Sequence, residues 1–391
     1  MAVNFVLVPL ITSSVSSTEY GGFIAYQTIC SILNVFVGFS SAAYISNAFI
    51  DPDAGPEISS ALLLASLLTL PAILLFAYVL NRNLQNYSMA IVLAMVVTGL
   101  LTYIVSYFQA YLILSRRYGD LLAVAMIQTL PQAGLITYCV LDGSLDLGKL
   151  VAGGVLGLLT AAAYCWHGLR ARLGWHFVAP GKATVRKVIL YGLPLIPHLL
   201  LSLAVGSFDR WFLTQMLNIE LLAVYAVALA VSAPMYALLD VANKVYAPLV
   251  FDRLRNGDAT IARFRWPFIC LNAYSMVCAS ACALAGSLYV RFFFKEEYIK
   301  ASQYCVPLCY SIGLFALYYS AAPFLYYFNK TRLVLLTSVV GACVTGAATL
   351  LLYPEMAGFG LVLGKSLGFL ASGVAAIGLA YHVVVWRKVV N

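Results

Sequence analysis

The sequence predicts an all-α polytopic membrane protein with about twelve transmembrane helices, arranged as two six-helix lobes around a central cavity. Composition is the first observation: of 391 residues, 63% are hydrophobic and only 10% are charged, whereas soluble domains carry roughly 25% charged residues. The mean hydropathy is +0.92, and aromatic residues make up 13% of the chain, which is typical of aromatic belts at membrane surfaces. A weak internal repeat is the third observation, and it predicts the lobes.

The predicted helices follow from the length of a membrane span. A bilayer core of about 30 Å is crossed by about 20 apolar residues in a helix, and this length divides the chain into about twelve segments joined by short connections. The predicted segments are 1–14, 21–48, 58–80, 88–114, 119–141, 148–168, 188–217, 221–250, 266–290, 301–328, 332–353 and 357–386. The first is short, and we expect it to be the second half of a longer helix.

Two pairs of segments resemble each other at an offset of about 200 residues. They are 17–29 with 218–230, and 44–51 with 246–253. We therefore predict an N-terminal lobe at 1–187 and a C-terminal lobe at 188–391. Because each lobe holds an even number of helices, the copies point the same way, and a central site between them is expected.

The distribution of lysine and arginine predicts the orientation. Most of these residues fall in the linkers after even-numbered segments and at the C-terminus, and the linker 168–187 is the most basic connection. Positively charged loops remain in the cytoplasm, so both termini are predicted to be cytoplasmic. The net charge of +8 includes no dense basic run, which argues against a nucleic-acid partner.

Prolines and a histidine mark the start of the segment 188–217. Pro194 and Pro197 remove backbone donors, so a kink or hinge is expected there, and His198 follows directly. His198 suits either ion coupling, because its charge changes near neutral pH, or a structural role at the loosened turn.

Two adjacent charges lie deep in the same segment. A charge at membrane depth costs at least ~2.5–3.5 kcal/mol, so Asp209 and Arg210 either mark a pathway or neutralise each other and neighbouring helices. Arg210 and Lys365 are each eight residues from the predicted outer end of their helix, ~12 Å inward. Lys365 therefore either joins a site with Arg210 or extends to the headgroups.

A second charged pair lies in the segment 221–250. Asp240 and Lys244 are spaced i,i+4, which predicts an ion pair on one helix face. Lys244 is also close enough to the cytoplasmic end to extend to the membrane surface. In the last segment, Gly360, Gly364 and Gly368 recur at four-residue spacing, which predicts a close helix contact.

Catalytic and cofactor motifs are missing from the sequence. There is no P-loop, dinucleotide fingerprint, HExxH or nucleophile elbow, which argues against an ATP-driven pump. The pairs Cys278/Cys282 and Cys305/Cys309 have helical spacing but no nearby histidine or carboxylate, so we expect packing roles. No metal or cofactor is expected.

Residues 191–213 and 223–238 resemble the start of the second half of polysaccharide-unit flippases of the Wzx type, in the multidrug/oligosaccharidyl-lipid/polysaccharide exporter superfamily. The positions that match are Gly192, Pro194, Pro197, Ser207, Asp209, Arg210 and Tyr225. The opening residues 9–29, with Glu19, Tyr20 and Gly21, are similar to the family's first hairpin. The short first helix departs from the family pattern.

The resemblance implies a flippase of the bacterial inner membrane that moves undecaprenyl-diphosphate-linked oligosaccharides outward by alternating access, for O-antigen or another surface polysaccharide. It also implies membrane lipids, a polysaccharide polymerase and a chain-length regulator as partners. For the doubly anionic headgroup, the expected binding residues are Arg210, Lys365 and Lys244. Asp209 and Asp240 are expected to tune those cations or to couple an ion gradient.

Two other function classes stay open. The first is an ion-coupled drug or metabolite antiporter of the same fold, although a cationic drug favours a cavity dominated by carboxylates. The second is a membrane polymerase or ligase acting on the same lipid-linked units, although the predicted external loops are short.

Overall fold

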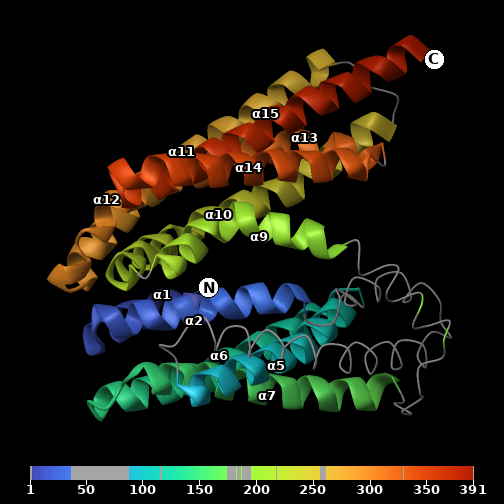
Figure 1. Cartoon of the computed structure of the whole chain (residues 1–391). Helices are drawn as coiled ribbons and strands as arrows, with labels where there is room; N and C mark the ends of the chain where they lie inside the picture. Colours follow the sequence, from blue (N-terminus) through green and yellow to red (C-terminus); the bar gives the residue numbers. More distant parts are fainter. Residues whose placement is uncertain are drawn as a thin grey trace. The chain divides into compact units, whose positions relative to one another are not determined.

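The computed structural model is helical throughout the residues that it describes (Figure 1). These are 2–36, 88–114, 117–173, 182, 186, 195–216, 218–255, 261–328 and 330–390. Within those ranges no strand occurs, and eight helical spans are long and apolar enough to cross a membrane. The predicted class of an all-α, multi-pass membrane protein is confirmed.

The N-terminal helices lie close to the predicted segments. They are α1 (Ala2–Ser14), α2 (Ser17–Phe36), α5 (Met89–Leu114), α6 (Tyr118–Leu141) and α7 (Leu147–Leu173). Predicted segment 58–80 and the end of 21–48 fall outside the described residues. Helix α2 begins with a capping box: the Glu19 backbone N–H donates to Ser16 Oγ, and the Ser16 backbone N–H donates to Glu19 Oε2 at 3.2 Å.

The C-terminal helices also follow the prediction, with one difference. They are α9 (Leu195–Gln215), α10 (Ile219–Arg255), α11 (Ile261–Phe293), α12 (Ala301–Leu314), α13 (Ala316–Tyr327), α14 (Thr331–Met356) and α15 (Gly358–Val390). A short 3-10 turn, η2 (Glu296–Tyr298), precedes α12. The predicted single helix at 301–328 is instead two helices, α12 and α13, which together make one span.

Hydrogen bonds next to Phe315, one of them from another helix, accompany the break between α12 and α13. The Ser275 hydroxyl of α11 donates to the Gly313 carbonyl at 2.9 Å, so that carbonyl has a partner outside its own helix. The Phe315 backbone N–H donates to the Ile312 carbonyl at 3.0 Å, three residues back, as in a 3-10 turn. Pro307 and Pro323 remove one backbone donor on each side of the break.

The chain divides into two compact units, Ser14–Leu200 and Met1–Ser13 with Leu201–Asn391. Most of residues 174–194 lie outside the described part of the chain. The predicted lobe boundary between residues 187 and 188 therefore stays a prediction.

In the first of these units, α7 packs against α2, α5 and α6. The buried core joins α5, α6 and α7, with Phe108 and Leu112 of α5 against Cys165 of α7. The Tyr26 and Thr98 hydroxyls are 2.6 Å apart and link α2 to α5. These contacts hold four helices together without any ion pair between the helices in the described residues.

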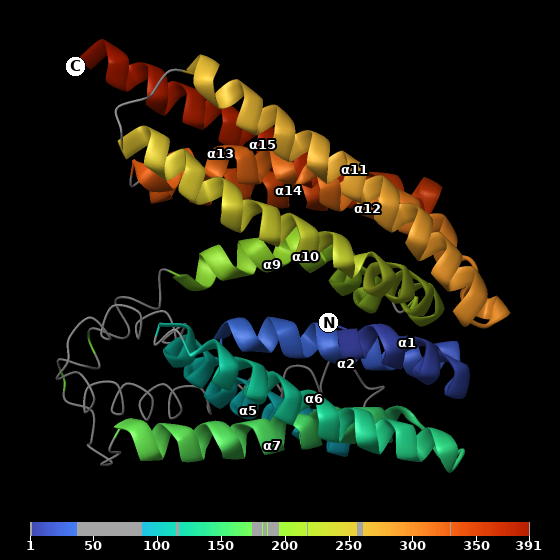
Figure 2. The ribbon, with the colours of Figure 1, turned by 180° about the vertical axis from the view of Figure 1, so that it is seen from behind.

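In the second unit, α15 packs against α12, α13 and α14, and α10 packs against α11, α12 and α13 (Figure 2). The glycine face predicted for α15 lies on α14: a Cβ at Gly364 would collide with Thr349, and one at Gly368 would collide with Thr345. Val205 of α9 lies against Gly341 of α14, and the Phe212 ring meets the Tyr353 ring at 5.0 Å. The α14–α15 pair thus supports α9, which carries the charged residues.

Candidate functional site

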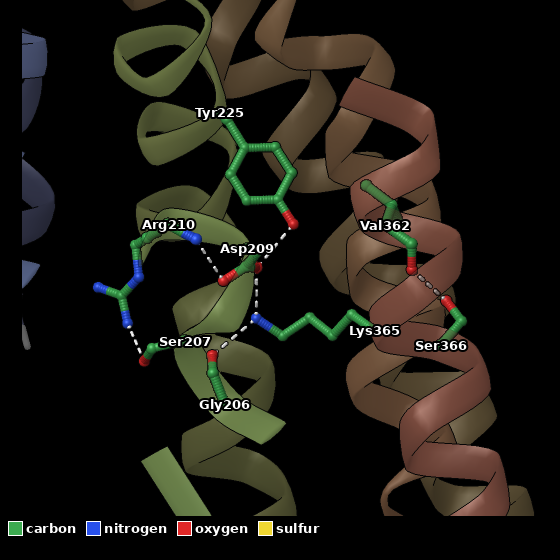
Figure 3. A network of polar contacts seen from close by, with 8 residues as sticks. All are labelled: Gly206, Ser207, Asp209, Arg210, Tyr225, Val362, Lys365 and Ser366. Carbon is green, nitrogen blue, oxygen red and sulfur yellow. Dashed lines mark hydrogen bonds and ion pairs between the residues drawn. The ribbon is translucent and has the colours of Figure 1, made fainter. Parts of the chain in front are cut away.

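A buried ion pair connects α9 to α15. Lys365 Nζ lies 2.8 Å from Asp209 Oδ2, although the two residues are 156 positions apart in the chain (Figure 3). Lys365 Nζ also donates to the Gly206 carbonyl at 2.9 Å. Both charged residues are only 2% exposed. Lys365 therefore does not extend to the headgroups, which was one of the two sequence-based alternatives.

The Asp209 carboxylate has a partner on both oxygens. The Tyr225 hydroxyl of α10 donates to Oδ2 at 2.7 Å, and the Arg210 backbone N–H donates to Oδ1 at 2.9 Å. A buried charge is tolerated only when it is paired and hydrogen-bonded, and these contacts meet that condition. The network holds α9, α10 and α15 together at one level and is electrically neutral.

Arg210 does not belong to the ion pair. Its side chain lies on the other side of α9 from Lys365 (Figure 3), and its Nη2 donates to the Ser207 hydroxyl at 2.6 Å. Arg210 Nε is buried and has no hydrogen-bond partner. In the described part of the chain, no carboxylate forms an ion pair with the guanidinium. Arg210 is thus a half-buried cation with unused donors.

The structure also settles the partner of Asp209. The sequence left open whether Asp209 and Arg210 neutralise each other or neighbouring helices. The carboxylate pairs with Lys365 of a neighbouring helix, and it contacts Arg210 only through the backbone. Neighbouring residues on a helix point about 100° apart, so one ligand cannot readily bridge both side chains.

The second predicted ion pair is present on α10. Lys244 Nζ lies 2.6 Å from Asp240 Oδ2, with side chains 71% and 49% exposed, respectively. This pair does not contact the Asp209–Lys365 pair directly. Tyr236 lies one helical turn before Asp240 on α10.

The remaining predicted site residues lie at the start of α9. Pro197 is exposed in the first turn of the helix, where a missing backbone donor breaks no helical hydrogen bond. Pro194 falls outside the described residues, and so does the side chain of His198. The hinge at the two prolines and the ion-coupling role of His198 stay predictions.

Two residues of the network had no chemical role in the sequence-based prediction. Ser207 binds the Arg210 guanidinium, and Tyr225 binds the Asp209 carboxylate. Both occupy positions of the family pattern, so a signal for them was present. The pattern alone does not tell which charged side chain each one contacts.

Comparison with protein families matches residues 1–250 to the family described as "Polysaccharide biosynthesis protein". A search of curated proteins gave no match. The family match covers more than half of the chain, including Asp209, Arg210 and Tyr225, and it ends before Lys365.

Solved structures with a similar fold are membrane transporters. The lipid II flippase MurJ, in an inward closed conformation, has a TM-score of 0.74 and 10% identity over 97% of this chain and 85% of that chain. An inward-facing multidrug resistance MATE family transporter of the MOP superfamily has a TM-score of 0.67 and 11% identity, over 99% of this chain and 96% of that chain. A mutant of the Vibrio cholerae MATE transporter VcmN has a TM-score of 0.59 and 14% identity, over 99% of each chain.

At these identities the structural likeness concerns the fold alone. The fold and the family match agree with the resemblance found in the sequence at residues 9–29 and 191–238. This chain therefore belongs to the polysaccharide biosynthesis protein family, and it has the fold of the multidrug/oligosaccharidyl-lipid/polysaccharide exporter superfamily.

Proposed function

We propose that this protein is a flippase that moves undecaprenyl-diphosphate-linked oligosaccharides from the cytoplasmic to the outer leaflet of the bacterial inner membrane. It works by alternating access between two lobes and serves the synthesis of O-antigen or another surface polysaccharide. Family membership supports a role in polysaccharide biosynthesis. The lipid diphosphate as the transported headgroup rests on the charges of α9.

One observation carries the proposal: no carboxylate in the described residues forms an ion pair with Arg210, a cation that the sequence predicts to lie at membrane depth. Its buried Nε has no hydrogen-bond partner. An anionic ligand would supply both the charge and the acceptors that the guanidinium lacks. A diphosphate has several anionic oxygens, and Arg210 is the residue that we assign to contact it.

Lys365 plays a different part from Arg210 in this conformation. Its ammonium is held by Asp209 and by the Gly206 carbonyl, so two of its three donors are occupied. It contacts the diphosphate only in a conformation in which the Asp209 ion pair opens. In the proposal, Asp209 keeps Lys365 charged and fixed, and Lys244 and Asp240 add exposed polar groups further along α10.

The proposal includes the predicted topology and partners. Both termini lie in the cytoplasm, which the basic linkers favour. Membrane lipids surround the helices. A polysaccharide polymerase and a chain-length regulator act next, because a repeat unit delivered to the outer leaflet must be joined to others.

A reconstituted flipping assay tests the role of Arg210. Wild type and Arg210→Ala are placed in liposomes with a lipid-linked oligosaccharide fraction, and an enzyme outside the liposomes modifies only the outward-facing glycan. A charge-assisted hydrogen bond contributes about 1.5–3 kcal/mol, so the flipping rate of Arg210→Ala should fall by about tenfold or more. Arg291→Ala, at an exposed arginine in the last turn of α11, serves as the matched control.

The outcome that contradicts the proposal is a wild-type rate in Arg210→Ala at equal protein level. Arg210→Lys separates charge from geometry, because lysine keeps the charge but cannot bind a phosphate through two parallel hydrogen bonds. We expect an intermediate rate for that variant.

Two other functions receive less support. An antiporter for cationic drugs needs a carboxylate that is available to the drug, whereas Asp209 is buried against Lys365. The antiporter function predicts that a proton or sodium gradient drives accumulation of a cationic dye, which can be measured in the same liposomes. A polymerase or ligase needs an external catalytic segment. The connection from α11 to α12 is short and contains only the turn η2.

A further inference from the structure

Helix α10 has two faces of the kinds expected in a membrane protein. One face is exposed and apolar, as a lipid-facing surface is, and consists of Leu238, Val241, Val245 and Leu249. A second face is buried in the unit and consists of Met235, Leu239, Tyr246 and Val250. At 100° per residue, the lipid-type face and the buried face leave about a third of the helix circumference for something else.

The remaining face of α10 is polar along its length. Its side chains are Tyr236, Asp240, Asn243 and Lys244, and none of the four is buried. Alanines at 233, 237 and 247 stand between them, and the Tyr236 ring is partly packed against the buried cluster around Met235. The face points about 160° away from the centre of the lipid-type face. Polar groups at membrane depth are costly in lipid, so they normally face water or a ligand.

Helix α13 extends this surface with tyrosines. Tyr319 is half-buried and packs against the buried cluster that contains Tyr246 and Val250 of α10. The Tyr326 side chain is 47% exposed. The Tyr246 hydroxyl donates to the Ser320 carbonyl at 2.9 Å, which fixes α13 against α10. The two packed helices therefore carry hydroxyl, carboxylate, amide and ammonium groups that are not fully buried.

The surface also reaches the site on α9. Tyr225, which donates to Asp209 at 2.7 Å, lies 11 residues before Tyr236 on α10, about three helical turns, so the two tyrosines lie on the same side of the helix. From Tyr236 to Lys244 the helix advances eight residues, ~12 Å. A ligand bound by Arg210 at one end therefore has polar partners for a further length of α10.

We propose that this surface, the α10–α13 polar face, binds the glycan of the transported lipid. It is formed by Tyr236, Asp240, Asn243, Lys244, Tyr319 and Tyr326. The inference rests on the proposed function, since it assigns a second part of the same substrate to a second part of the protein.

The chemistry of the face favours a sugar over the other candidate ligands. A sugar hydroxyl is both donor and acceptor, and the face offers both, from the ammonium and the carboxylate of a neutral ion pair. Tyrosine adds a flat apolar ring next to a hydroxyl, which suits the apolar side of a pyranose. A phosphate would need donors alone, and a cationic drug would need a carboxylate that is not already paired.

Native mass spectrometry of the purified full-length protein tests the assignment. The probes are undecaprenyl diphosphate and a lipid-linked oligosaccharide fraction extracted from the source bacterium, offered together. The variant is the double change Asp240→Ala/Lys244→Ala, which removes both charges and leaves no unpaired one. Tyr326→Ala is a second variant, and Val245→Ala, on the lipid-type face, is the control.

The wild type should bind the glycosylated lipid in preference to the bare one. In the double variant, the ratio of the affinities for the glycosylated and the bare lipid should fall by about tenfold, which corresponds to one good hydrogen bond. Its affinity for undecaprenyl diphosphate should not change. Arg210→Ala should lose binding of both the glycosylated and the bare lipid. An unchanged preference in the double variant and in Tyr326→Ala overturns the assignment. An equal loss of both lipids in the double variant also overturns it. Failure of the wild type to bind either lipid refutes the proposed function itself.

Discussion

The Asp209–Lys365 ion pair allows a quantitative prediction of stability. Replacing Lys365 by Met keeps an unbranched side chain one atom shorter and removes the ammonium, so a carboxylate that is 2% exposed loses its only ion-pair partner in the described residues. Breaking a buried pair on one side costs about 3–5 kcal/mol of unfolding free energy. Asp209→Asn should cost a similar amount, because it leaves Lys365 charged and buried.

The double variant Asp209→Asn/Lys365→Met should recover most of that loss. It contains no buried charge, and an asparagine still accepts the hydrogen bond that Tyr225 donates at 2.7 Å to Asp209. Replacing a buried ion pair by uncharged residues of similar size is often neutral or stabilising. Each single change costs about 3–5 kcal/mol and the double change is close to neutral, so the coupling energy from the cycle of four proteins should approach the sum of the two single losses, about 6–10 kcal/mol.

The measurement is equilibrium unfolding in mixed micelles of mild detergent and sodium dodecyl sulfate, monitored by tryptophan fluorescence. The pair Asp240–Lys244 provides an internal control, because its side chains are 49% and 71% exposed and its spacing is i,i+4. The cycle Asp240→Asn/Lys244→Met should give a coupling of only about 0.3–0.5 kcal/mol. If the two cycles give equally small couplings, the reasoning from burial is refuted.

Two further predictions concern contacts around this network. Gly364→Ala places a methyl group against Thr349 and should lower the free energy of unfolding by about 1–3 kcal/mol. Gly378→Ala, in open space on the same helix, should raise it by about 0.5–1 kcal/mol. Thermal unfolding of both variants tests this, and equal shifts in melting temperature would contradict the close contact. Tyr225→Phe should lower the free energy of unfolding by about 1.5–3 kcal/mol in wild type and by clearly less in the Asp209→Asn background. An equal loss in both backgrounds would show that the hydroxyl does not act through the carboxylate.

The helices could be predicted because the bilayer imposes a length on them. Predicted segments such as 88–114 and 119–141 differ from α5 and α6 by one residue at most. The break at Phe315 could not be predicted in this way, because it depends on Ser275 of another helix taking a carbonyl of α12. The prolines at 307 and 323 lie eight residues to each side of the break and do not mark its position.

The candidate site was predictable as far as local spacing reaches. The i,i+4 rule predicted the Asp240–Lys244 pair, and counting residues from the helix ends predicted that Arg210 and Lys365 lie at similar depth. The depth of a residue does not determine the direction in which its side chain leaves the helix axis. Counting residues therefore could not predict that Lys365 contacts Asp209 rather than Arg210. That choice depends on the packing of α14 and α15, which places Lys365 against α9.

Asp209 and Arg210 are adjacent on α9 but have different partners, because a helix turns about 100° per residue. Asp209 faces α15 and is neutralised by Lys365, whereas Arg210 faces elsewhere and its guanidinium donates to the neutral hydroxyl of Ser207. Asp209 and Lys365 form a neutral pair, so Arg210 adds a net positive charge, which the sequence predicts to lie at membrane depth. Such a charge is stable only when water or an anion reaches it. A purely structural network would require a second carboxylate beside Arg210. In the residues that the structure describes, none forms an ion pair with it, which is the strongest physical reason to expect an anionic headgroup there.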